Sequence, residues 1–383
     1  MTGTDQDRLV APAQEWQSAG LRRRVTDVVQ QASCNRRSPK ETLLTSLMLA
    51  EAAASGAAVA RQLATIDQAL AALADDLRAH PPQLALTVAR GSSDHAASYF
   101  AYLAMAHLGL PVLSLPPSLV TLRQAPLRVE GQLALGFSQS GRSPDLIETL
   151  SALDRYGART AALVNEIDSP LALACRHAIG VQAGPEQSVA ATKSFIATLA
   201  AAARLIAHWQ QDETLLAAGA ALPEALDRAA ELSWAPALPV LRDAERCMVV
   251  GRGPGFAIAQ EAALKLKETS ALQGEAFSGA ELQHGPLALV ERGYPLLIFA
   301  LRGPEQAGLL QLARDLRGRG ARVLLAAPDE VAERDLPLTV AGHPDLDGLL
   351  AIQSFYRMAA LLAEARGQDP DRPRHLRKVT LTR

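Results

Sequence analysis

The sequence contains few cysteines and no long apolar run. Its three cysteines, Cys34, Cys175 and Cys247, lie far apart among 383 residues and show no metal-ligand spacing. In a chain of this length such cysteines are typical of free thiols in a reducing compartment. We therefore expect no disulfide framework, no metal site and no other cofactor.

Membrane and export signals are also missing. The most apolar stretch, residues 195–209, is interrupted by Arg204 and is typical of a buried helix. At the N-terminus, Asp5, Asp7 and Arg8 precede any apolar run, so the chain has no signal-peptide core. We expect a cytoplasmic protein that does not enter a membrane.

The chain has no excess of charge of either sign. Its formal net charge is -2, whereas nucleic-acid-binding proteins normally carry a basic surplus or a basic patch. We therefore expect no nucleic-acid partner. The near-neutral balance does not exclude small anions, because a single loop can bind a phosphate.

Apolar residues are abundant, at 49%, and they recur in the order apolar run, glycine turn and helix. Residues 84–89 and 133–137 are apolar runs that end in the turns 90–93 and 138–141, and residues 160–164 are a third run. Strands alternating with helices in this way predict parallel sheets covered on both faces. The length suggests two such domains, at about 150 residues each.

The same order returns later in the chain at a nearly constant distance. Three groups of residues recur in order, two of them 162 and one 163 residues later, which indicates a duplication. We expect the helical segment at residues 195–232 to join the two copies. The groups are Arg90-Gly91 with Arg252-Gly253, Phe137 and Gly141 with Phe299 and Gly303, and Gly157-Ala158-Arg159 with Gly320-Ala321-Arg322.

The N-terminal segment is polar and unpatterned, with arginine clusters at residues 22–24 and 36–37. It is predicted to be a disordered leader or to lie upstream of a start at Met48. A short DNA-binding headpiece is an alternative that so weak a pattern does not favour. We divide the chain into a leader at 1–47, a first α/β domain at 48–215, a second at 216–365 and a C-terminal tail at 366–383.

Hydroxyl groups follow the buried strand at residues 133–137. At the ends of parallel strands, the next helix presents free backbone N–H groups and its positive dipole end to an anion. Gly141 lets the backbone approach a ligand closely, and Pro144 suits a first helical turn. Three hydroxyls and a glycine in six residues favour a phosphate site, although helix capping alone would explain Ser92 and Ser93. The predicted phosphate ligands are Ser138, Gln139, Ser140 and Ser143, with Ser92 and Ser93 from the neighbouring strand.

The second copy lacks this group of serines. It carries Leu301-Arg302-Gly303 at the corresponding position. We expect this copy to have lost phosphate binding, which leaves one anion site per chain.

Several further motifs occur in order between residues 48 and 383. They are QSVAATK at 187–193, EAALKLKE at 261–268, ELQHGP at 281–286 and HLRKVT at 375–380. Together with the serine loop they resemble the sugar isomerase (SIS) domain family. The tandem pair is similar to the isomerase half of glucosamine-6-phosphate synthase and to stand-alone double-SIS deaminases and isomerases. The resemblance implies two flavodoxin-like αβα domains, each a parallel sheet between helices, and a sugar-phosphate substrate.

The resemblance also assigns the acid–base chemistry. Glu268 is implied as the base that moves a proton between C1 and C2 of the sugar. Glu261, Lys265 and Glu268 share one face of a helix at spacings of four and three, for which a surface ion-pair ladder is the alternative. His284 is implied to open the sugar ring from the partner subunit of a homodimer.

The tail and one loop are implied to contact the sugar. Lys378 matches the family lysine that forms a Schiff base with the open-chain ketose, and non-covalent binding is the alternative. In the loop at 187–193, Lys193 is equally typical of a solvated lysine. The implied sugar-binding residues are Gly91, Val189, Ala190, Thr192 and Glu261.

One departure from the synthase bears on the reaction. The synthase begins with a glutaminase domain whose nucleophile is a cysteine at position two, where this sequence has Thr2. We therefore expect an isomerase-deaminase that converts glucosamine 6-phosphate and water into fructose 6-phosphate and ammonia. A galactosamine-6-phosphate deaminase or a nitrogen-free ketose/aldose isomerase would use the same residues. A non-catalytic sugar-phosphate sensor is the alternative of another class, and the presence of Glu268, His284 and Lys378 favours the enzyme.

Overall fold

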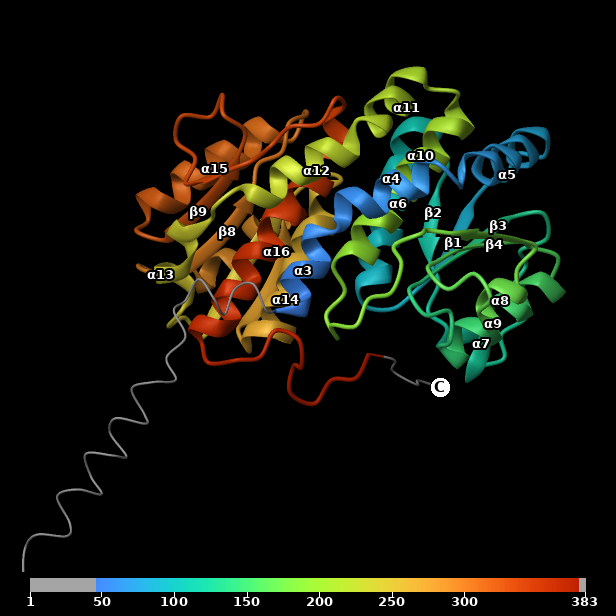
Figure 1. Ribbon diagram of the computed structural model, residues 1–383, viewed down its shortest axis with the longest axis horizontal. Helices are drawn as coiled ribbons and strands as arrows, with labels where there is room; N and C mark the ends of the chain where they lie inside the picture. The colour runs from blue at the N-terminus through green and yellow to red at the C-terminus, as the bar shows by residue number, and fades with distance from the viewer. Residues whose placement is uncertain (1–45, 379–383) are drawn as a thin grey trace, which may run out of the picture. The chain divides into compact units, whose positions relative to one another are not determined.

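Two parallel β-sheets form the framework of the protein in the computed structural model, which describes residues 46–378 (Figure 1). The first sheet has the strand order β2-β1-β3-β4-β5, and all neighbouring strands run parallel. Val88 at the end of β1 lies beside Gly136 of β3, so the turns after these two strands meet at one edge. The strands are β1 (Ala85–Val88), β2 (Val112–Ser114), β3 (Leu133–Ser138), β4 (Arg159–Val164) and β5 (His177–Gly180).

The second sheet repeats this arrangement. Its order is β7-β6-β8-β9-β10, again with all neighbours parallel. Both sheets therefore have the flavodoxin-like order, whose ligand sites lie beyond the carboxyl ends of the strands. The predicted fold class is confirmed. The strands are β6 (Arg246–Gly251), β7 (Gln273–Ser278), β8 (Pro295–Phe299), β9 (Arg322–Ala327) and β10 (Leu336–Pro337).

Alternate residues of the buried strands face two different cores. In the first sheet, Leu135 and Phe137 of β3 pack with helices α5, α6 and α10, while Ala134 packs with α8 and α9. The sheet is therefore covered on both faces, as its continuous apolar strands predict. The helices of this half are α5 (Asp67–Ala79), α6 (Ser92–Leu108), α7 (Ser118–Thr121), α8 (Pro144–Arg155), α9 (Pro170–Leu173) and α10 (Lys193–Gln210).

The inner face of the second sheet belongs to the same large core as that of the first. Val249 and Phe299 pack there with helices α14 and α16, while Val250 and Ile298 face a separate core under α15. One continuous core therefore links the two halves. The helices here are α14 (Gly255–Ser270), α15 (Gln306–Gly318) and α16 (Asp347–Ala365), with the 3₁₀ turns η2 (Glu281–Gln283), η3 (Pro286–Leu289) and η4 (Pro344–Leu346).

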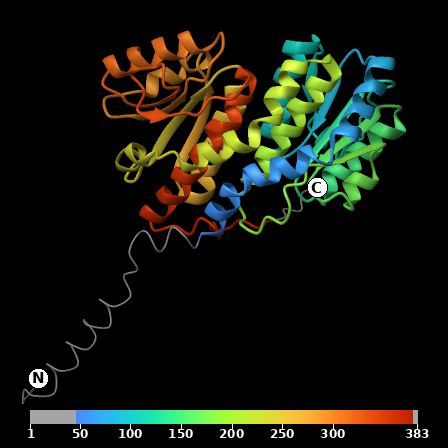
Figure 2. The ribbon, with the colours of Figure 1, turned by 45° about the horizontal axis from the view of Figure 1, so that its top comes forward.

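The first and last described helices lie side by side between the two sheets (Figures 1 and 2). Helix α3 packs on α16, and α4 packs on α10 and α12. The predicted helical connection at residues 195–232 is confirmed, since α10, α11 and α12 follow one another there. These remaining elements are α3 (Leu47–Ala53), α4 (Ser55–Leu63), α11 (Glu213–Ala220), α12 (Leu222–Glu231), η1 (Ala235–Ala237) and α13 (Leu238–Leu241).

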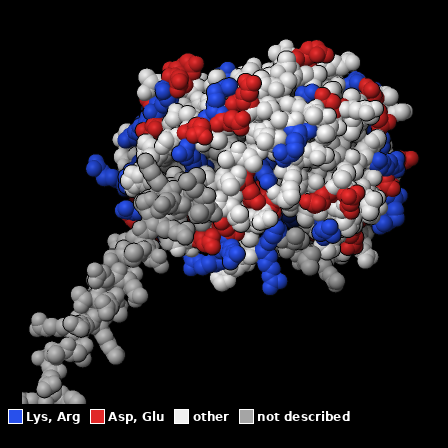
Figure 3. All heavy atoms as spheres, in the orientation of Figure 1, with Lys and Arg blue, Asp and Glu red and all other residues white. Residues whose placement is uncertain are grey.

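Parts of the predicted leader and tail lie outside the described residues. They are residues 1–45 of the leader, which include Cys34, and residues 379–383 of the tail. Between residues 46 and 378, no helix has the length and apolar composition that spanning a membrane requires. On the face shown in Figure 3, basic and acidic side chains are interspersed rather than gathered by sign.

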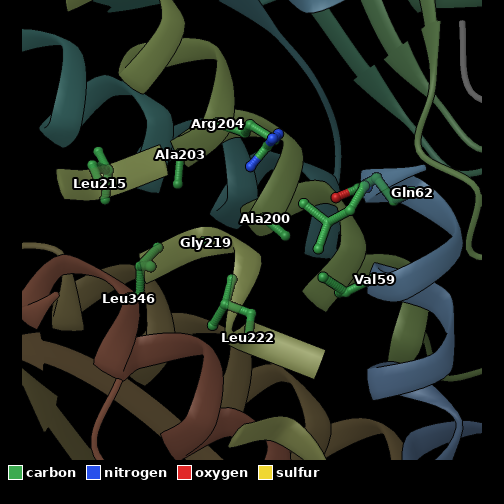
Figure 4. Close-up of a pocket in the computed structure, with 10 residues that line it drawn as sticks. Val59, Gln62, Ala200, Ala203, Arg204, Leu215, Gly219, Leu222 and Leu346 are labelled. Atoms are coloured by element: carbon green, nitrogen blue, oxygen red, sulfur yellow. The ribbon is translucent and has the colours of Figure 1, made fainter. Parts of the chain in front are cut away.

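A small cavity lies among α4, α10, α11 and α12 (Figure 4). Its volume of about 10 Å³ is the size of one water molecule, and it is too small for a sugar phosphate. Gln62 Oε1 and Arg204 Nη1 are buried atoms without a hydrogen-bond partner among the described residues, and both residues line the cavity. The cavity belongs to the packing of the helices, and the predicted site residues lie elsewhere.

Candidate active site

The serine loop after β3 depends on a glycine. Gly141 has a φ of +61°, and a Cβ atom there would lie 2.0 Å from Ser169 Oγ, so a side chain at this position is excluded. Ser138 Oγ accepts a hydrogen bond of 3.0 Å from the Gly141 N–H. Ser143 is the N-cap residue of α8, yet its hydroxyl makes no capping bond, and Pro144 follows in the first turn as predicted. The loop thus presents hydroxyls and backbone N–H groups at a helix N-terminus, which suits a phosphate.

Two residues connect this loop and the helix after it to neighbouring segments. Arg90, after β1, forms an ion pair of 3.1 Å with the buried carboxylate of Asp145 in the first turn of α8. Asn165, after β4, donates its backbone N–H to the carbonyl oxygen of Ser138 (3.3 Å). Its side chain donates to the carbonyl oxygen of Gly184 (2.9 Å). Asn165 therefore connects the phosphate loop to the loop that precedes α10.

Ser92 and Ser93 begin α6 at the same edge of the sheet. Ser92 Oγ donates to Glu261 Oε1 (3.0 Å) and accepts from Lys265 Nζ (3.1 Å). This hydroxyl therefore contacts the second half of the chain, which the sequence pattern did not indicate. Gly91, just before it, has a φ of +56°, which other residues seldom adopt. Phosphate binding by Ser92 and Ser93 stays a prediction.

Glu261, Lys265 and Glu268 lie on one face of α14, and that face is buried. Their side chains are 0%, 1% and 20% exposed, so the alternative of a surface ion-pair ladder is wrong. Lys265 Nζ lies 3.3 Å from Glu261 Oε1 and donates a hydrogen bond to Glu268. Burial opposes the charge on Lys265, but the carboxylates of Glu261 and Glu268 outweigh it and raise the pKa of the ammonium. Lys265 is therefore a buried cation between two carboxylates.

Two residues that the sequence did not single out complete the surroundings of Glu261. His95 Nδ1 lies 2.9 Å from Glu261 Oε2, and Tyr356 Oη donates to Glu261 Oε1 over 3.4 Å. Burial alone would raise the pKa of Glu261, but Lys265 and His95 lower it below its usual value. The position of His95 one helical turn after Ser92 was an available signal. Tyr356 comes from α16, and no local pattern connects it to α14.

The loop before α10 surrounds a second buried carboxylate, that of Glu186. It accepts hydrogen bonds from the N–H of Thr192 (3.0 Å) and from Ser194 Oγ (2.6 Å). Lys378 Nζ from the tail lies 3.1 Å from Glu186 Oε2 and donates to the Ser188 carbonyl oxygen over 2.7 Å. The tail lysine therefore lies on the predicted sugar-binding loop. The sequence motif included the residues of this loop but missed Glu186.

Other loop residues are placed by the same contacts. The Val189 N–H donates to the Asp371 carbonyl oxygen of the tail (3.3 Å), and Ala190 is buried. Lys193 begins α10 and is 8% exposed, so the interpretation of a solvated lysine is wrong.

The pKa of Tyr356 is affected by both buried carboxylates, those of Glu261 and Glu186. Burial, and then the carboxylates of Glu261, Glu186 and Glu268, raise the pKa of its hydroxyl well above the usual value. The hydroxyl of Tyr356 bonds Glu261 and also lies within the electrostatic influence of Glu186. Hydrogen bonds join the residues of an acid–base cluster, and a second group lies around Glu186. The acid–base cluster consists of Ser92, His95, Glu261, Lys265, Glu268 and Tyr356, and the second group of Glu186, Thr192 and Lys378.

His284 is not bonded to the acid–base cluster among the described residues. It is exposed and follows the short 3₁₀ turn η2. Within residues 46–378 no hydrogen bond or ion pair joins its imidazole to the acid–base residues. Its contribution from a partner subunit stays a prediction.

The corresponding loop of the second half holds its own charged side chains. Arg302 forms a bidentate pair with Asp347, at 2.7 and 2.8 Å. Glu305 stands at the N-cap of α15, as Ser143 does at that of α8, and accepts a hydrogen bond of 2.7 Å from Tyr102. A Cβ atom on Gly253 would lie 2.7 Å from the carboxylate of Glu305. These contacts accord with the expectation that this half has lost phosphate binding.

The two described cysteines, Cys175 and Cys247, are free thiols. Burial raises the pKa of each to about 12. Neither is therefore a thiolate near neutral pH, which removes both as nucleophiles.

Comparisons with known proteins agree with this geometry. The model of the SIS domain matches residues 83–207 and 240–327. A glutamine–fructose-6-phosphate aminotransferase (isomerizing) from Methanothermobacter thermautotrophicus is 31% identical over 299 residues, which cover 76% of this chain and 50% of the relative. The protein of the same name from Aeropyrum pernix is 34% identical over 321 residues, which cover 77% and 50%. The chain thus spans about half the length of the curated relatives it matches.

A solved structure matches over its full length. It is described as a phosphosugar isomerase from Silicibacter pomeroyi and is 40% identical to this chain. The TM-score is 0.81, and the match covers 85% of this chain and 100% of the other.

Proposed function

Because this chain belongs to the SIS domain family, we propose that it is an amino-sugar-phosphate isomerase-deaminase. It converts glucosamine 6-phosphate and water into fructose 6-phosphate and ammonia. The observation that carries this proposal is the buried cluster of Glu261, Lys265 and Glu268, which lies against Ser92 at the phosphate-binding edge of the first sheet.

The first half binds the phosphate. The hydroxyls of Ser138, Ser140 and Ser143, the amide of Gln139 and the N-terminus of α8 supply neutral donors and a positive dipole end. Ser93 adds a hydroxyl from the neighbouring turn, whereas the hydroxyl proton of Ser92 is donated to Glu261. Anchoring the phosphate places the other end of the open-chain sugar toward the acid–base cluster, which removes the entropy cost of finding that geometry during reaction.

Glu268 is the proton carrier. Its side chain is 20% exposed, whereas Glu261 is fully buried, so of these two carboxylates only Glu268 has access to a bound sugar. It takes the proton from C2 and delivers it to C1, which turns the aldose into the 2-imine of the ketose. Water then adds to C2, and ammonia leaves as the C2 carbonyl forms. Lys265 stabilises the negative charge that develops during this transfer.

Ring opening comes first and is assigned to His284 of the partner subunit in a homodimer.

Lys378 acts on the open-chain sugar from the tail. In this structure its ammonium donates to Glu186 and Ser188. A Schiff base would need the amine in its neutral form, and non-covalent binding would not. The proposed sugar contacts come from Gly91, Val189, Ala190 and Thr192. The predicted contact by Glu261 is not kept, because its carboxylate is fully buried and bonded to other side chains. No nucleic acid or membrane partner enters this proposal, and we place the reaction in the cytoplasm.

One assay tests the reaction. The pure protein is incubated separately with glucosamine 6-phosphate, galactosamine 6-phosphate and fructose 6-phosphate, and ammonia and ketose are measured independently. We expect equal amounts of ammonia and ketose from glucosamine 6-phosphate. Ketose without ammonia, from an aldose phosphate, would leave the nitrogen-free isomerase. Tight binding of sugar phosphates without any turnover would overturn the enzyme and support the sensor.

A further inference from the structure

Two side chains of the first half reach into the acid–base cluster of the second. Ser92 and His95 lie one helical turn apart at the start of α6, so they share a face of that helix. Both bond the carboxylate of Glu261, Ser92 at Oε1 (3.0 Å) and His95 at Oε2 (2.9 Å). The function proposed above gives no role to either of these two contacts.

Glu261 cannot act on a substrate itself. Its side chain is fully buried, and its two oxygens are occupied by His95, Ser92, Lys265 and Tyr356. A buried carboxylate is costly unless it is paired and hydrogen-bonded. Glu261 therefore serves to hold its neighbours, and those neighbours hold it ionised.

The carboxylates of the acid–base cluster outnumber its ammonium groups, and the imidazole of His95 lies beside one of these carboxylates. Glu261 and Glu268 carry two negative charges against one positive charge on Lys265. A buried imbalance of this kind is unfavourable, and His95 is the titratable group that contacts the deepest carboxylate from the opposite helix. Its side chain is 17% exposed, so most of it is shielded from bulk solvent.

We propose that His95 is a positioning residue for proton transfer, which acts through Glu261 to keep the ammonium of Lys265 directed at Glu268. This inference rests on the function proposed above. The first half of the chain then supplies more than phosphate binding, because an imidazole on α6 fixes the geometry of the base on α14.

The arrangement has a consequence for pH dependence. The groups that contact Glu261 are Lys265 on α14, Ser92 and His95 on α6, and Tyr356 on α16. Glu268 is paired with Lys265, Glu186 acts electrostatically on Tyr356, and Asp94 is beside His95 in the chain. Burial raises the pKa of Glu261, and Lys265 and His95 lower it. Removing His95 takes away part of the lowering, so the pKa of Glu261 rises. The ionised form is then lost at a higher pH, and the acid limb of the kcat profile moves upward.

Three substitutions separate this role from simple packing. His95→Phe keeps the ring and removes the hydrogen bond, whereas His95→Asn keeps a donor near the position of Nδ1. His107 provides the matched control, because it lies on the same helix and its Nε2 contacts Asp345 of the second half at 2.6 Å. His107 has no bond to the acid–base cluster among the described residues, so His107→Phe removes an equivalent contact between the halves.

For His95→Phe we expect a kcat about ten- to a hundredfold lower, with KM for glucosamine 6-phosphate within about threefold. The acid limb should move up by about half a pH unit or more. His95→Asn should recover most of kcat, and His107→Phe should stay within about twofold of wild type with an unmoved limb. A His95→Phe variant with wild-type kcat and an unmoved limb would overturn the proposal, as would equal losses in His95→Phe and His107→Phe.

A second measurement tests the coupling of His95 to Glu261 without requiring the enzyme to turn over a substrate. The carboxyl ¹³C resonance of Glu261 is titrated by NMR in wild type, His95→Phe and His107→Phe without any substrate. A higher midpoint only in His95→Phe supports the coupling, even if no sugar phosphate is turned over and the proposed function fails. Equal midpoints in the three proteins would refute the coupling.

Discussion

The ammonium of Lys378 lies 3.1 Å from the carboxylate of Glu186, a residue 192 positions earlier in the chain. This carboxylate is fully buried as a side chain and is otherwise held by Thr192 and Ser194. The contact fixes the tail against the sugar-binding loop. It gives the tail a defined position.

The pairing predicts an acid-sensitive contribution to stability. Burial opposes ionisation of Glu186, but Lys378 and the hydrogen bonds from Ser194 and Thr192 lower its pKa below the usual 4.5. Ionised Glu186 therefore stabilises the fold above about pH 4.5, and this contribution is lost as the pH falls through the lower, folded-state value. Glu186→Gln should have a lower Tm than wild type at pH 7, and the difference should shrink toward pH 3. Glu148→Gln, on an exposed position of α8, should show no such trend.

Glu268→Gln tests the proton carrier. Because glutamine cannot accept the C2 proton, kcat should fall by about 10² to 10⁴-fold. Binding of fructose 6-phosphate, measured by calorimetry, should stay within about threefold, since the phosphate contacts lie in the first half. The exposed Glu275→Gln on β7 is the control and should be fully active. An active Glu268→Gln protein would show that another group moves the proton.

Lys265→Met tests the charge balance of the cluster. The substitution leaves the buried Glu261 without its cation, which costs about 3–5 kcal/mol in comparable buried pairs. We expect a large loss of unfolding free energy in urea at pH 7. The double variant Lys265→Met/Glu261→Gln should regain part of that loss, because it also removes the uncompensated negative charge. If the double variant is as unstable as the single one, packing rather than charge accounts for the effect.

Gly141→Ala tests the phosphate loop. Its Cβ would meet Ser169 Oγ at 2.0 Å and its φ is +61°, whereas Gly131 has a φ of +72° with nothing within 4 Å of a Cβ. Both alanine variants carry the cost of a positive φ, about 1 kcal/mol or more. Only Gly141→Ala must also displace the loop, so it alone should weaken binding of fructose 6-phosphate, by about tenfold or more. Equal affinities in the two variants would argue against a role for this loop.

A mixing experiment tests the contribution of His284 across a dimer interface. His284→Ala and Glu268→Gln are each expected to be inactive as homodimers. If each site takes Glu268 from one subunit and His284 from the other, mixed dimers contain one intact site. Unfolding and refolding an equal mixture should then restore about a quarter of wild-type activity. A mixture that stays inactive would place both residues in the site of a single chain.

The fold was largely predictable from local patterns. Apolar runs such as residues 133–137 and the recurrence of Arg90-Gly91 as Arg252-Gly253 are short-range signals, and they specify two copies of a parallel sheet. Within the site, Glu261, Lys265 and Glu268 share a helix face by spacing alone. Their burial could not be read from that spacing, because it depends on α6 and α16 packing against α14.

The residues that sequence reasoning missed are those whose partners lie far away in the chain. Tyr356 is 95 positions from Glu261, and His95 is 166 positions from it. Glu186 contacts Lys378 only because the tail packs against the loop before α10. Such pairings are set by the packing of whole elements, and no periodicity within one element encodes them.

The continuous core that links the inner faces of both sheets has a consequence for how such chains can change. Residues such as Phe137 and Phe299 belong to one packed cluster, although they come from different copies. If one copy were exchanged between two related chains, the inner face of its sheet would carry side chains that pack against a different second copy. Because overpacked and underpacked cores both destabilise, exchange of a single copy is expected to destabilise the protein. Substitutions on one inner face therefore constrain those tolerated on the other.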